Sequence, residues 1–365
     1  MEIVDSKFSF KFNKNLYLIF NIYEALFFDI ETTGFSPQKT KLYLIGCAYF
    51  DGIENEFCIK QWFMNDYADE AIMLSSFFDF VSGFKYIVHY NGNGFDIPYI
   101  IEKCKHYNMS YDFSSLISID IYKEIFPIKN IFKLENTKQK SIEGFLNIPR
   151  DDKYSGGELI PMFYEYLENH SDKCKAFLLE HNHDDLAGLI KILPILNYTS
   201  IFNDEFTINN VKLNYLDENY PKEVIFECKT LYPSPVRISF GNSTYYVTWM
   251  DTTLKIKAPI YSGGLKYFYP NYKDYYYLPK EDCSIHKSVA FYVDKNYRTK
   301  ANAANCYSKK TGRFIPQINE IIKPYFKIDY YDKTTYFELT KELIDTPNAL
   351  KGFIIDIINS LKKIK

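Results

Sequence analysis

Two acidic side chains, Asp29 and Glu31, stand at the end of a strongly apolar segment, within the string DIETTG at residues 29–34. Residues i and i+2 of a strand point to the same face, so the two carboxylates are expected to project together. Neighbouring carboxylates repel each other unless a cation lies between them, and hard divalent ions such as Mg²⁺ prefer oxygen ligands. The competing interpretation is a solvated strand end before a turn. The whole string after an apolar strand favours a metal site.

A second group of polar residues follows another apolar segment, in the string HYNGNGFD at residues 89–96. Gly92 and Gly94 permit a sharp turn and a close approach of a ligand to the backbone. Asp96 comes directly before a helix that is expected to begin near Pro98, because proline suits a first helical turn. Asp96 is therefore a candidate metal ligand, and the alternative is that it is an ordinary helix N-cap.

A third group lies on the last helix expected in the first half, in the string LLEHNHDDL at residues 178–186. His181 and Asp185 are four residues apart and share one face of that helix. Asp184, three residues from His181, is an alternative to Asp185. A His beside an Asp on a helix is also a common surface arrangement. A functional role for this pair is therefore favoured only when the other two motifs are considered with it.

The three motifs, taken in this order, resemble the DEDD exonuclease superfamily within the RNase H-like fold. More narrowly, they resemble the YprB-type RNase H-like proteins of bacteria. The resemblance rests on FFDIETTGFSP with KLYLIG, on HYNGNGFDIP, on SIEGFLNI followed by ELIP, and on HNHDDL. It covers roughly residues 20–198, and no resemblance is claimed for residues 200–365.

This resemblance implies a metal-dependent 3′→5′ exonuclease that acts on single-stranded ends of DNA or RNA with two Mg²⁺ or Mn²⁺ ions. The implied metal ligands are Asp29, Glu31, Asp96 and Asp185. His181 is the residue implied to orient or deprotonate the attacking water, although its spacing from Asp185 is that of the subclass with Tyr at this position.

The resemblance also bears on residues around the four carboxylates. Thr32 and Asn91, which belong to the first two motifs, are expected to contact nucleic acid. Asp120 is expected to play a structural or supporting role.

The elements that would position these residues are those of an α/β fold. Residues 25–30, 41–50 and 55–63 are apolar and predict a three-stranded meander. Helices are expected at residues 68–82, from about Pro98 to Tyr107, and at residues 158–169 and 172–193, with a further strand at residues 85–90. Together they predict an RNase H-like mixed sheet flanked by helices over residues 1–200.

The second half has a different pattern and charge. Residues 223–261 alternate and predict strands, and helices are expected around residues 284–304 and 339–363. We therefore expect a smaller α+β domain at residues 201–365. Residues 1–200 contain 19 basic and 28 acidic residues, whereas residues 201–365 contain 24 and 18, so the halves carry net charges of −9 and +6. A polyanionic partner is consistent with this asymmetry.

One basic segment, residues 286–314, interleaves cations with aromatic side chains. Cations neutralise phosphates and aromatic rings stack on unpaired bases, so the segment is a candidate nucleic-acid surface. The alternative is a solvated basic helix in a tyrosine-rich protein. The residues assigned to this surface are Lys287, Arg298, Lys309 and Arg313.

Composition narrows the remaining possibilities. The seven cysteines are widely spaced, which argues against a zinc ribbon or a dense disulfide framework and favours a reduced, cytoplasmic setting. No long uncharged apolar run predicts a membrane span, so no membrane partner is expected.

Two other functions remain open: a nucleic-acid-binding protein that does not cleave, and a structure-specific endonuclease on the same fold. Residues 201–365 could also serve protein docking.

Overall fold

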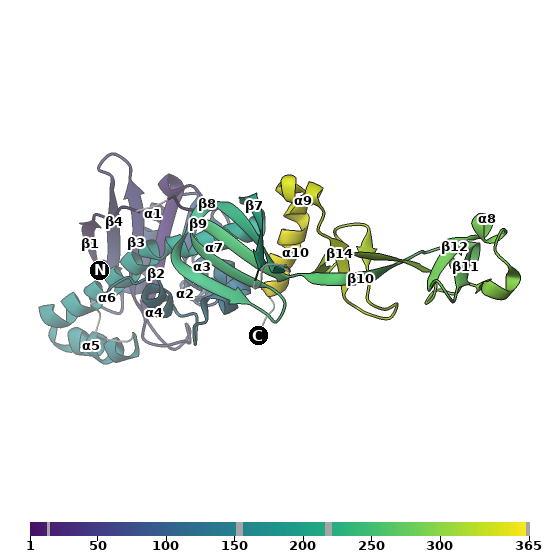
Figure 1. Cartoon of the computed structure of the whole chain (residues 1–365). Coiled ribbons are helices and arrows are strands. Elements are labelled where there is room, and N and C mark those ends of the chain that lie inside the picture. The colour runs from purple at the N-terminus through teal and green to yellow at the C-terminus, as the bar shows by residue number, and fades with distance from the viewer. Residues whose placement is uncertain (13–14, 151–155, 216–220, 363–365) are drawn as a thin grey trace. The chain divides into compact units, whose positions relative to one another are not determined.

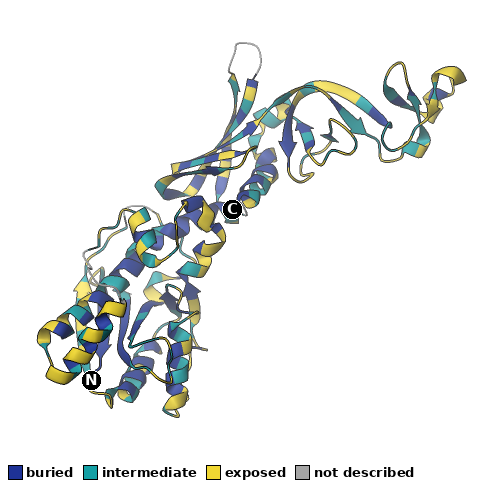
Figure 2. Cartoon of the chain, turned by 90° about the horizontal axis from the view of Figure 1, so that it is seen from below, coloured by how far each residue is buried: buried dark blue, intermediate teal, exposed yellow. Residues whose placement is uncertain are grey.

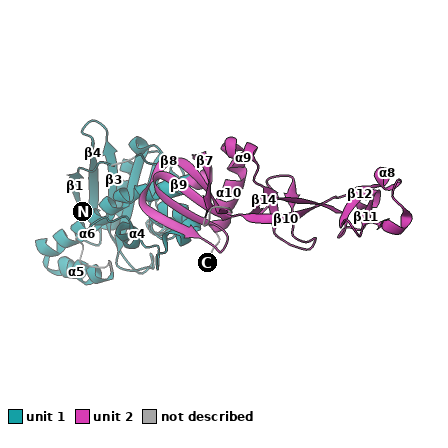
Figure 3. Ribbon diagram, viewed as in Figure 1, with its two compact units in different colours: residues 1–200 teal, residues 201–365 magenta. Residues whose placement is uncertain are grey.

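The computed structural model describes residues 1–12, 15–150, 156–215 and 221–362. The chain forms two compact units, Met1–Ser200 and Ile201–Lys365 (Figure 3). In each unit the strands and the inner helix faces carry most of the buried residues, and exposed residues gather on outer helix faces and turns (Figure 2).

A six-stranded mixed sheet forms the centre of the first unit, with the strand order β1-β4-β3-β2-β5-β6 (Figure 1). Strands β2, β3 and β4 form the predicted antiparallel meander, whereas β5 and β6 run parallel to β2. The strands are β1 (Glu2–Phe8), β2 (Ala25–Thr32), β3 (Leu42–Asp51), β4 (Glu56–Phe63), β5 (Tyr86–His89) and β6 (Ile117–Asp120). The predicted α/β class with a mixed sheet flanked by helices is confirmed.

Helices cover both faces of this sheet, which is why β2 is apolar on both sides. Phe28 stacks on Phe77 of α1 with the ring centroids 5.4 Å apart. The neighbouring Asp29 instead faces α6, where it accepts a hydrogen bond from Asn182. The helices are α1 (Asp69–Val81), α2 (Asp96–His106), α3 (Ile121–Ile125), α4 (Gln139–Phe145), α5 (Gly156–Asn169), α6 (Asp172–Lys191) and α7 (Asn197–Ser200).

The edge strand β1 was not predicted from the sequence. It pairs antiparallel with β4, and its residues alternate between half-buried and exposed. Asp5, which is paired with Lys60 at 2.6 Å, and Lys7 occupy two of its exposed positions, and Ile3 occupies the third. The frequent charges hide the short alternation that an edge strand produces.

The second unit contains three small antiparallel sheets, with the strand orders β7-β8-β9, β10-β14-β16-β15 and β12-β11-β13. Its strands are β7 (Phe206–Tyr215), β8 (Pro221–Gly241), β9 (Tyr246–Pro259), β10 (Tyr261–Phe268), β11 (Tyr275–Leu278), β12 (Cys283–His286), β13 (Thr299–Lys300), β14 (Tyr307–Gln317), β15 (Tyr325–Phe326) and β16 (Thr335–Glu338). Its helices are α8 (Lys287–Ala290), α9 (Lys341–Asp345) and α10 (Lys351–Leu361). Helix α10 supplies Phe353, whose ring lies 5.8 Å from that of Phe226 and 4.9 Å from that of Phe337.

Two helix predictions in this unit are wrong or only partly right. The segment around residues 284–304 forms β12, the single-turn helix α8 and β13 instead of a long helix. Val289 and Phe291 remain exposed there, so no apolar stripe exists to bury a longer helix. The helix expected at residues 339–363 is divided near Pro347, which cannot continue a helical hydrogen-bond ladder.

One helical segment among the described residues, Asp172–Asn203, is long and apolar enough to cross a membrane by length and composition alone. In its most apolar window 72% of the residues are buried within the protein, as in a core helix. All seven cysteines are free thiols.

Candidate active site

The first two carboxylates lie on β2 with the alternation that the sequence predicts. Glu31 is buried and Asp29 is half-buried, and both face helix α6. The Nδ2 atom of Asn182 donates to Oδ2 of Asp29 at 2.9 Å. The Nε2 atom of His181 lies 3.5 Å from Oε1 of Glu31. Consecutive residues of one helix therefore contact the two carboxylates.

Helix α6 adds the third motif to the same place. His181 is buried, and its Nε2 atom lies 3.3 Å from Oδ2 of Asp185, one helical turn later. Glu31, His181 and Asp185 each offer a ligand atom within 4.8 Å of the others, so they could hold a metal ion. Asp184 lies instead beside His183, at 3.5 Å, and the structure does not bring it to this group.

Asp96 reaches the same edge of the sheet through the backbone of β2. Its carboxylate accepts hydrogen bonds from the amide of Ile30, between Asp29 and Glu31, and from its own amide. Burial raises the pKa of Asp96 to about 7, and the charge of Asp120 adds to this effect while the two amides oppose it. Asp96 is the first residue of α2, which Phe95 precedes in the N-cap position, so the interpretation of Asp96 as an ordinary N-cap is wrong.

The electrostatics of Asp29 show that the four predicted carboxylates form one cluster. Burial is the largest cause that raises the pKa of Asp29 well above its usual range. The negative charges of other carboxylates add to it, in the order Asp185, Asp96 and Glu31. The hydrogen bond from Asn182 opposes this rise in the pKa. A divalent cation would relieve the repulsion that these charges create.

A buried amide network holds Asn182 against Asp29, and it was not predicted from the sequence. Gln61 of β4 donates to Oδ1 of Asn182 at 2.9 Å and to the carbonyl oxygen of Leu179 at the same distance. Gly46 lies directly opposite Asp29 in the register of β2 and β3. A Cβ atom added at Gly46 would lie 1.9 Å from Oδ1 of Asn182, so only glycine lets α6 approach here.

Arg150 is a second residue that sequence reasoning missed. Its Nη2 atom contacts Oδ1 of Asp185, and its Nη1 atom lies 3.2 Å from both carboxylate oxygens of Glu143. Gln139 also donates to Glu143 at 3.0 Å and to the carbonyl oxygen of Asp185 at 2.8 Å. Arg150 is the only arginine among residues 1–200, and this isolation within the acidic half is the one signal that could have identified it.

The glycine-rich loop after β5 is organised by Asp120 and His89. The amide of Asn91 donates to Oδ1 of Asp120 at 2.9 Å, and Asn91 has a φ angle of 63°. The amide of Gly92 donates to Nδ1 of His89 at 3.0 Å. Burial lowers the pKa of His89 to about 4, so this imidazole is neutral and can accept that bond. Asp120 thus holds the loop, in line with the supporting role expected for it.

The two other residues expected to contact nucleic acid in this unit lie in different settings. Thr32 is half-buried and donates its hydroxyl to the carbonyl oxygen of Gly34 at 2.9 Å. Asn91 is exposed and lines a cavity of about 430 Å³ together with Tyr90, Tyr122 and residues 136–139. The amide of Asn91 binds Asp120, and Gln139 binds the backbone of Asp185, so this cavity adjoins the acidic cluster.

The basic residues predicted in the second unit do not form one patch of unpaired charge. Lys287 of α8 pairs with Asp274 at 2.6 Å. Lys309 of β14 pairs with Asp282, and this contact is the main cause that holds the pKa of Asp282 well below its usual range.

The two arginines assigned to the same surface lie on separate elements. Arg298, which follows a short 3₁₀ turn, lies over the ring of Tyr276 at 5.0 Å from its centroid. Arg313 lies on β14 opposite Ser262. Lys309 and Arg313 therefore share β14, whereas Lys287 and Arg298 lie on other segments of this unit.

Comparison with known proteins finds a family model that matches most of the first unit. Residues 26–197 match the family model of the RNase_H superfamily, and this region contains all five residues of the candidate site. No curated protein matches the sequence.

Several solved structures are similar in part. The family B DNA polymerase of the hyperthermophilic archaeon Pyrobaculum calidifontis is 17% identical, with 66% of this chain and 33% of that chain covered and a TM-score of 0.38. A structure of exonuclease I is 11% identical, with 55% and 54% covered and a TM-score of 0.29. The zinc-bound E. coli exonuclease I complex with single-stranded DNA is 12% identical, with the same coverage and a TM-score of 0.28. The chain spans between a third and about half of the length of these proteins.

Proposed function

We propose that the protein is a metal-dependent nuclease of the DEDD group, related to the YprB-type proteins, which removes nucleotides from the 3′ end of single-stranded DNA or RNA. The observation that carries this proposal is the convergence of Glu31, His181 and Asp185, with Asp29 and Asp96 in the same electrostatic cluster. Three separated segments of the chain supply these residues, and the match to the RNase_H superfamily spans all of them.

The donor set suits divalent magnesium or manganese. It consists of carboxylate oxygens, and burial together with the charges of the neighbouring carboxylates raises the pKa of Asp29. Asp29, Glu31, Asp96 and Asp185 would hold two ions. When bound, two such ions stabilise the attacking and leaving oxygens of an in-line displacement at phosphorus.

The side chains of the chain have separate tasks in this proposal. His181 accepts the proton of the attacking water at Nε2, because that atom faces Glu31 and Asp185 at the centre of the cluster. Glu31 and Asp185 orient its imidazole. The cavity beside Asn91 offers room for the nucleotide at the strand end.

The test uses 5′-labelled single-stranded DNA and the matching RNA, with Mn²⁺, Mg²⁺ or EDTA. The proposal expects a metal-dependent ladder that shortens from the 3′ end. Asp185→Asn should reduce the rate by orders of magnitude. Asp184→Asn is the matched control, because Asp184 is adjacent on the same helix but lies beside His183.

Other outcomes of this assay identify the alternatives. Internal cuts at junctions or branches would replace the exonuclease with a structure-specific endonuclease. Binding without cleavage under every metal condition would contradict a nuclease and favour a binding protein. Equal loss of activity in Asp184→Asn and Asp185→Asn would contradict the assignment of the site.

A further inference from the structure

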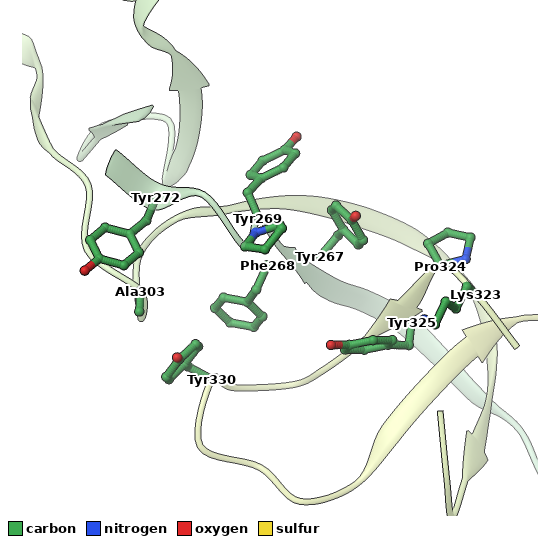
Figure 4. Close-up of a pocket in the computed structure, with 10 residues that line it drawn as sticks. Tyr267, Phe268, Tyr269, Tyr272, Ala303, Lys323, Pro324, Tyr325 and Tyr330 are labelled. Atoms are coloured by element: carbon green, nitrogen blue, oxygen red, sulfur yellow. The ribbon is translucent and has the colours of Figure 1, made fainter. Parts of the chain in front are cut away.

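The second unit contains a cavity whose lining includes none of the functional residues named so far. It has a volume of about 730 Å³, within the range of natural ligand pockets (Figure 4). Strand β10 and the segment after it form one side, and residues 323–330 form another. The lining residues are Tyr267, Phe268, Tyr269, Pro270, Tyr272, Ala303, Lys323, Pro324, Tyr325 and Tyr330.

The cavity is built where short strands present aromatic side chains from different segments. Figure 4 shows Phe268, Tyr325 and Tyr330 pointing toward one another from β10, β15 and the loop after β15. The rings of Phe268 and Tyr330 are 5.3 Å apart at an interplanar angle of 68°. Phe268, Tyr325 and Tyr330 are half-buried, so parts of their rings remain accessible to a ligand.

The charge of the lining favours an anionic ligand. Among the ten described lining residues, Lys323 is an exposed cation and none is a carboxylate. Of the nearby carboxylates, those of Asp274 and Asp329 are paired with Lys287 at 2.6 Å and with Lys266 at 3.6 Å, and that of Glu320 accepts a hydrogen bond from the hydroxyl of Tyr325. The sequence of this half also carries the net charge of +6.

We propose that this cavity binds unpaired bases of a single nucleic-acid strand. The bases would stack on its tyrosine rings, and Lys323 would contact a phosphate. Aromatic rings accept every base because every base has a π-face, and a cation beside them neutralises the backbone. Aromatic grooves also bind proline-rich peptides, but such a ligand carries no charge that requires Lys323 and a carboxylate-free lining.

This inference rests on the proposed function and deepens it, because it names a surface that would hold the single strand. It assigns nucleic-acid binding to residues 267–272 and 323–330 instead of the basic segment at residues 286–314. The sequence does not reveal the cavity, because tyrosine and phenylalanine are abundant throughout the chain, at 34 and 31 residues.

The test measures binding of the full chain, in EDTA, to a fluorescein-labelled single strand by fluorescence anisotropy. The double variant Tyr272→Ala, Tyr330→Ala removes two rings that belong to no strand of the sheets. The affinity should fall by about 5- to 150-fold for each ring that stacks on a base. Tyr330→Trp should retain binding. Tyr246→Ala is the control, because Tyr246 is a tyrosine of the same unit that is more exposed than Tyr272 and Tyr330 but does not line the cavity.

Two further ligands test whether the cavity binds the bases of a strand or a free nucleotide. An abasic strand of equal length should bind to the unaltered protein as weakly as the intact strand binds to the double variant. Displacement of the labelled strand by a mononucleotide, at the same concentration at which an unlabelled strand displaces it, would show a site for free nucleotides. That result would overturn the proposal that the cavity binds a strand. The proposal would also be overturned if the double variant bound the strand with unchanged affinity. It would be overturned as well if a proline-rich peptide, but no unlabelled nucleic acid, displaced the labelled strand.

Failure of this inference is distinguishable from failure of the proposed function. Metal-dependent cleavage by a chain whose double variant still binds normally would reject the cavity and retain the nuclease. Cavity-dependent binding without cleavage at any metal concentration would reject the nuclease and retain the cavity as a strand-binding site.

Discussion

Replacement of Asn182 by alanine should weaken divalent metal binding although Asn182 is not itself a proposed ligand. Its Nδ2 atom donates to Asp29 at 2.9 Å, and its side chain is fully buried. This bond lowers the pKa of Asp29, whereas burial and the charges of three carboxylates raise it. Loss of the bond therefore makes the ionised, metal-binding form of Asp29 less stable.

The expected magnitude follows from the kind of bond that is lost. A hydrogen bond to a charged group contributes about 1.5–3 kcal/mol. If the ionised form of Asp29 loses that amount, affinity for Mn²⁺ should fall about 10- to 150-fold near neutral pH. Gln61 loses one acceptor but keeps the carbonyl oxygen of Leu179, so the free energy of unfolding should fall only modestly.

Titration calorimetry with Mn²⁺ measures this effect directly, and Asn197→Ala is the control. Asn197 is also buried, donates to the carbonyl oxygen of Asn15 at 3.0 Å and accepts from the amide of Tyr17 at 2.7 Å. Its loss should destabilise the protein without a change in metal affinity. If Asn182→Ala weakens Mn²⁺ binding no more than Asn197→Ala does, the amide network does not tune the site.

Three other predictions follow from the same unit. Because burial raises the pKa of Asp96 to about 7, the free energy of unfolding of the metal-free protein should fall as pH rises from about 4 to about 7 and then level off. Asp96→Asn should flatten that dependence in denaturant titrations, and an unchanged slope would contradict it. Gly46→Ala should cost about 1–3 kcal/mol by chemical denaturation, whereas Gly264→Ala, whose added Cβ atom would lie 3.7 Å from Oγ1 of Thr311, should cost clearly less. Arg150→Ala should cost about 3 kcal/mol because it leaves Glu143 buried with less compensation, and adding Glu143→Gln should recover much of that loss. No recovery would show that the loss does not arise from Glu143 but from Asp185, the other partner of Arg150, or from packing.

The sequence predicted the parts of the site that depend on local periodicity. Asp29 and Glu31 share a face because strand residues alternate, and His181 meets Asp185 because a helix returns after four residues. Neither rule depends on the rest of the fold. The meander of β2, β3 and β4 was likewise predictable, because its strands are long and apolar.

The parts that the sequence did not reveal depend on contacts between distant residues. Arg150 meets Asp185 only after α4 and α6 have packed, and Asn182 reaches Asp29 only because Gly46 has no side chain. In the second unit, β11 has four residues and β13 has two, which is too short for an alternating pattern to be recognised. Pairing across the sheet, not local preference, holds such strands.

The position of α6 in the chain has a consequence for synthesis. This helix packs on β2, β3 and β4, and it carries His181, Asn182 and Asp185. A nascent chain that has not yet extended to α6 can hold the carboxylates of Asp29, Glu31 and Asp96 but has neither the imidazole nor the last acid. In the nuclease proposed here, hydrolysis would begin only when the first unit has been translated almost to its end, so an incomplete chain could not attack the messenger or ribosomal RNA beside which it is made.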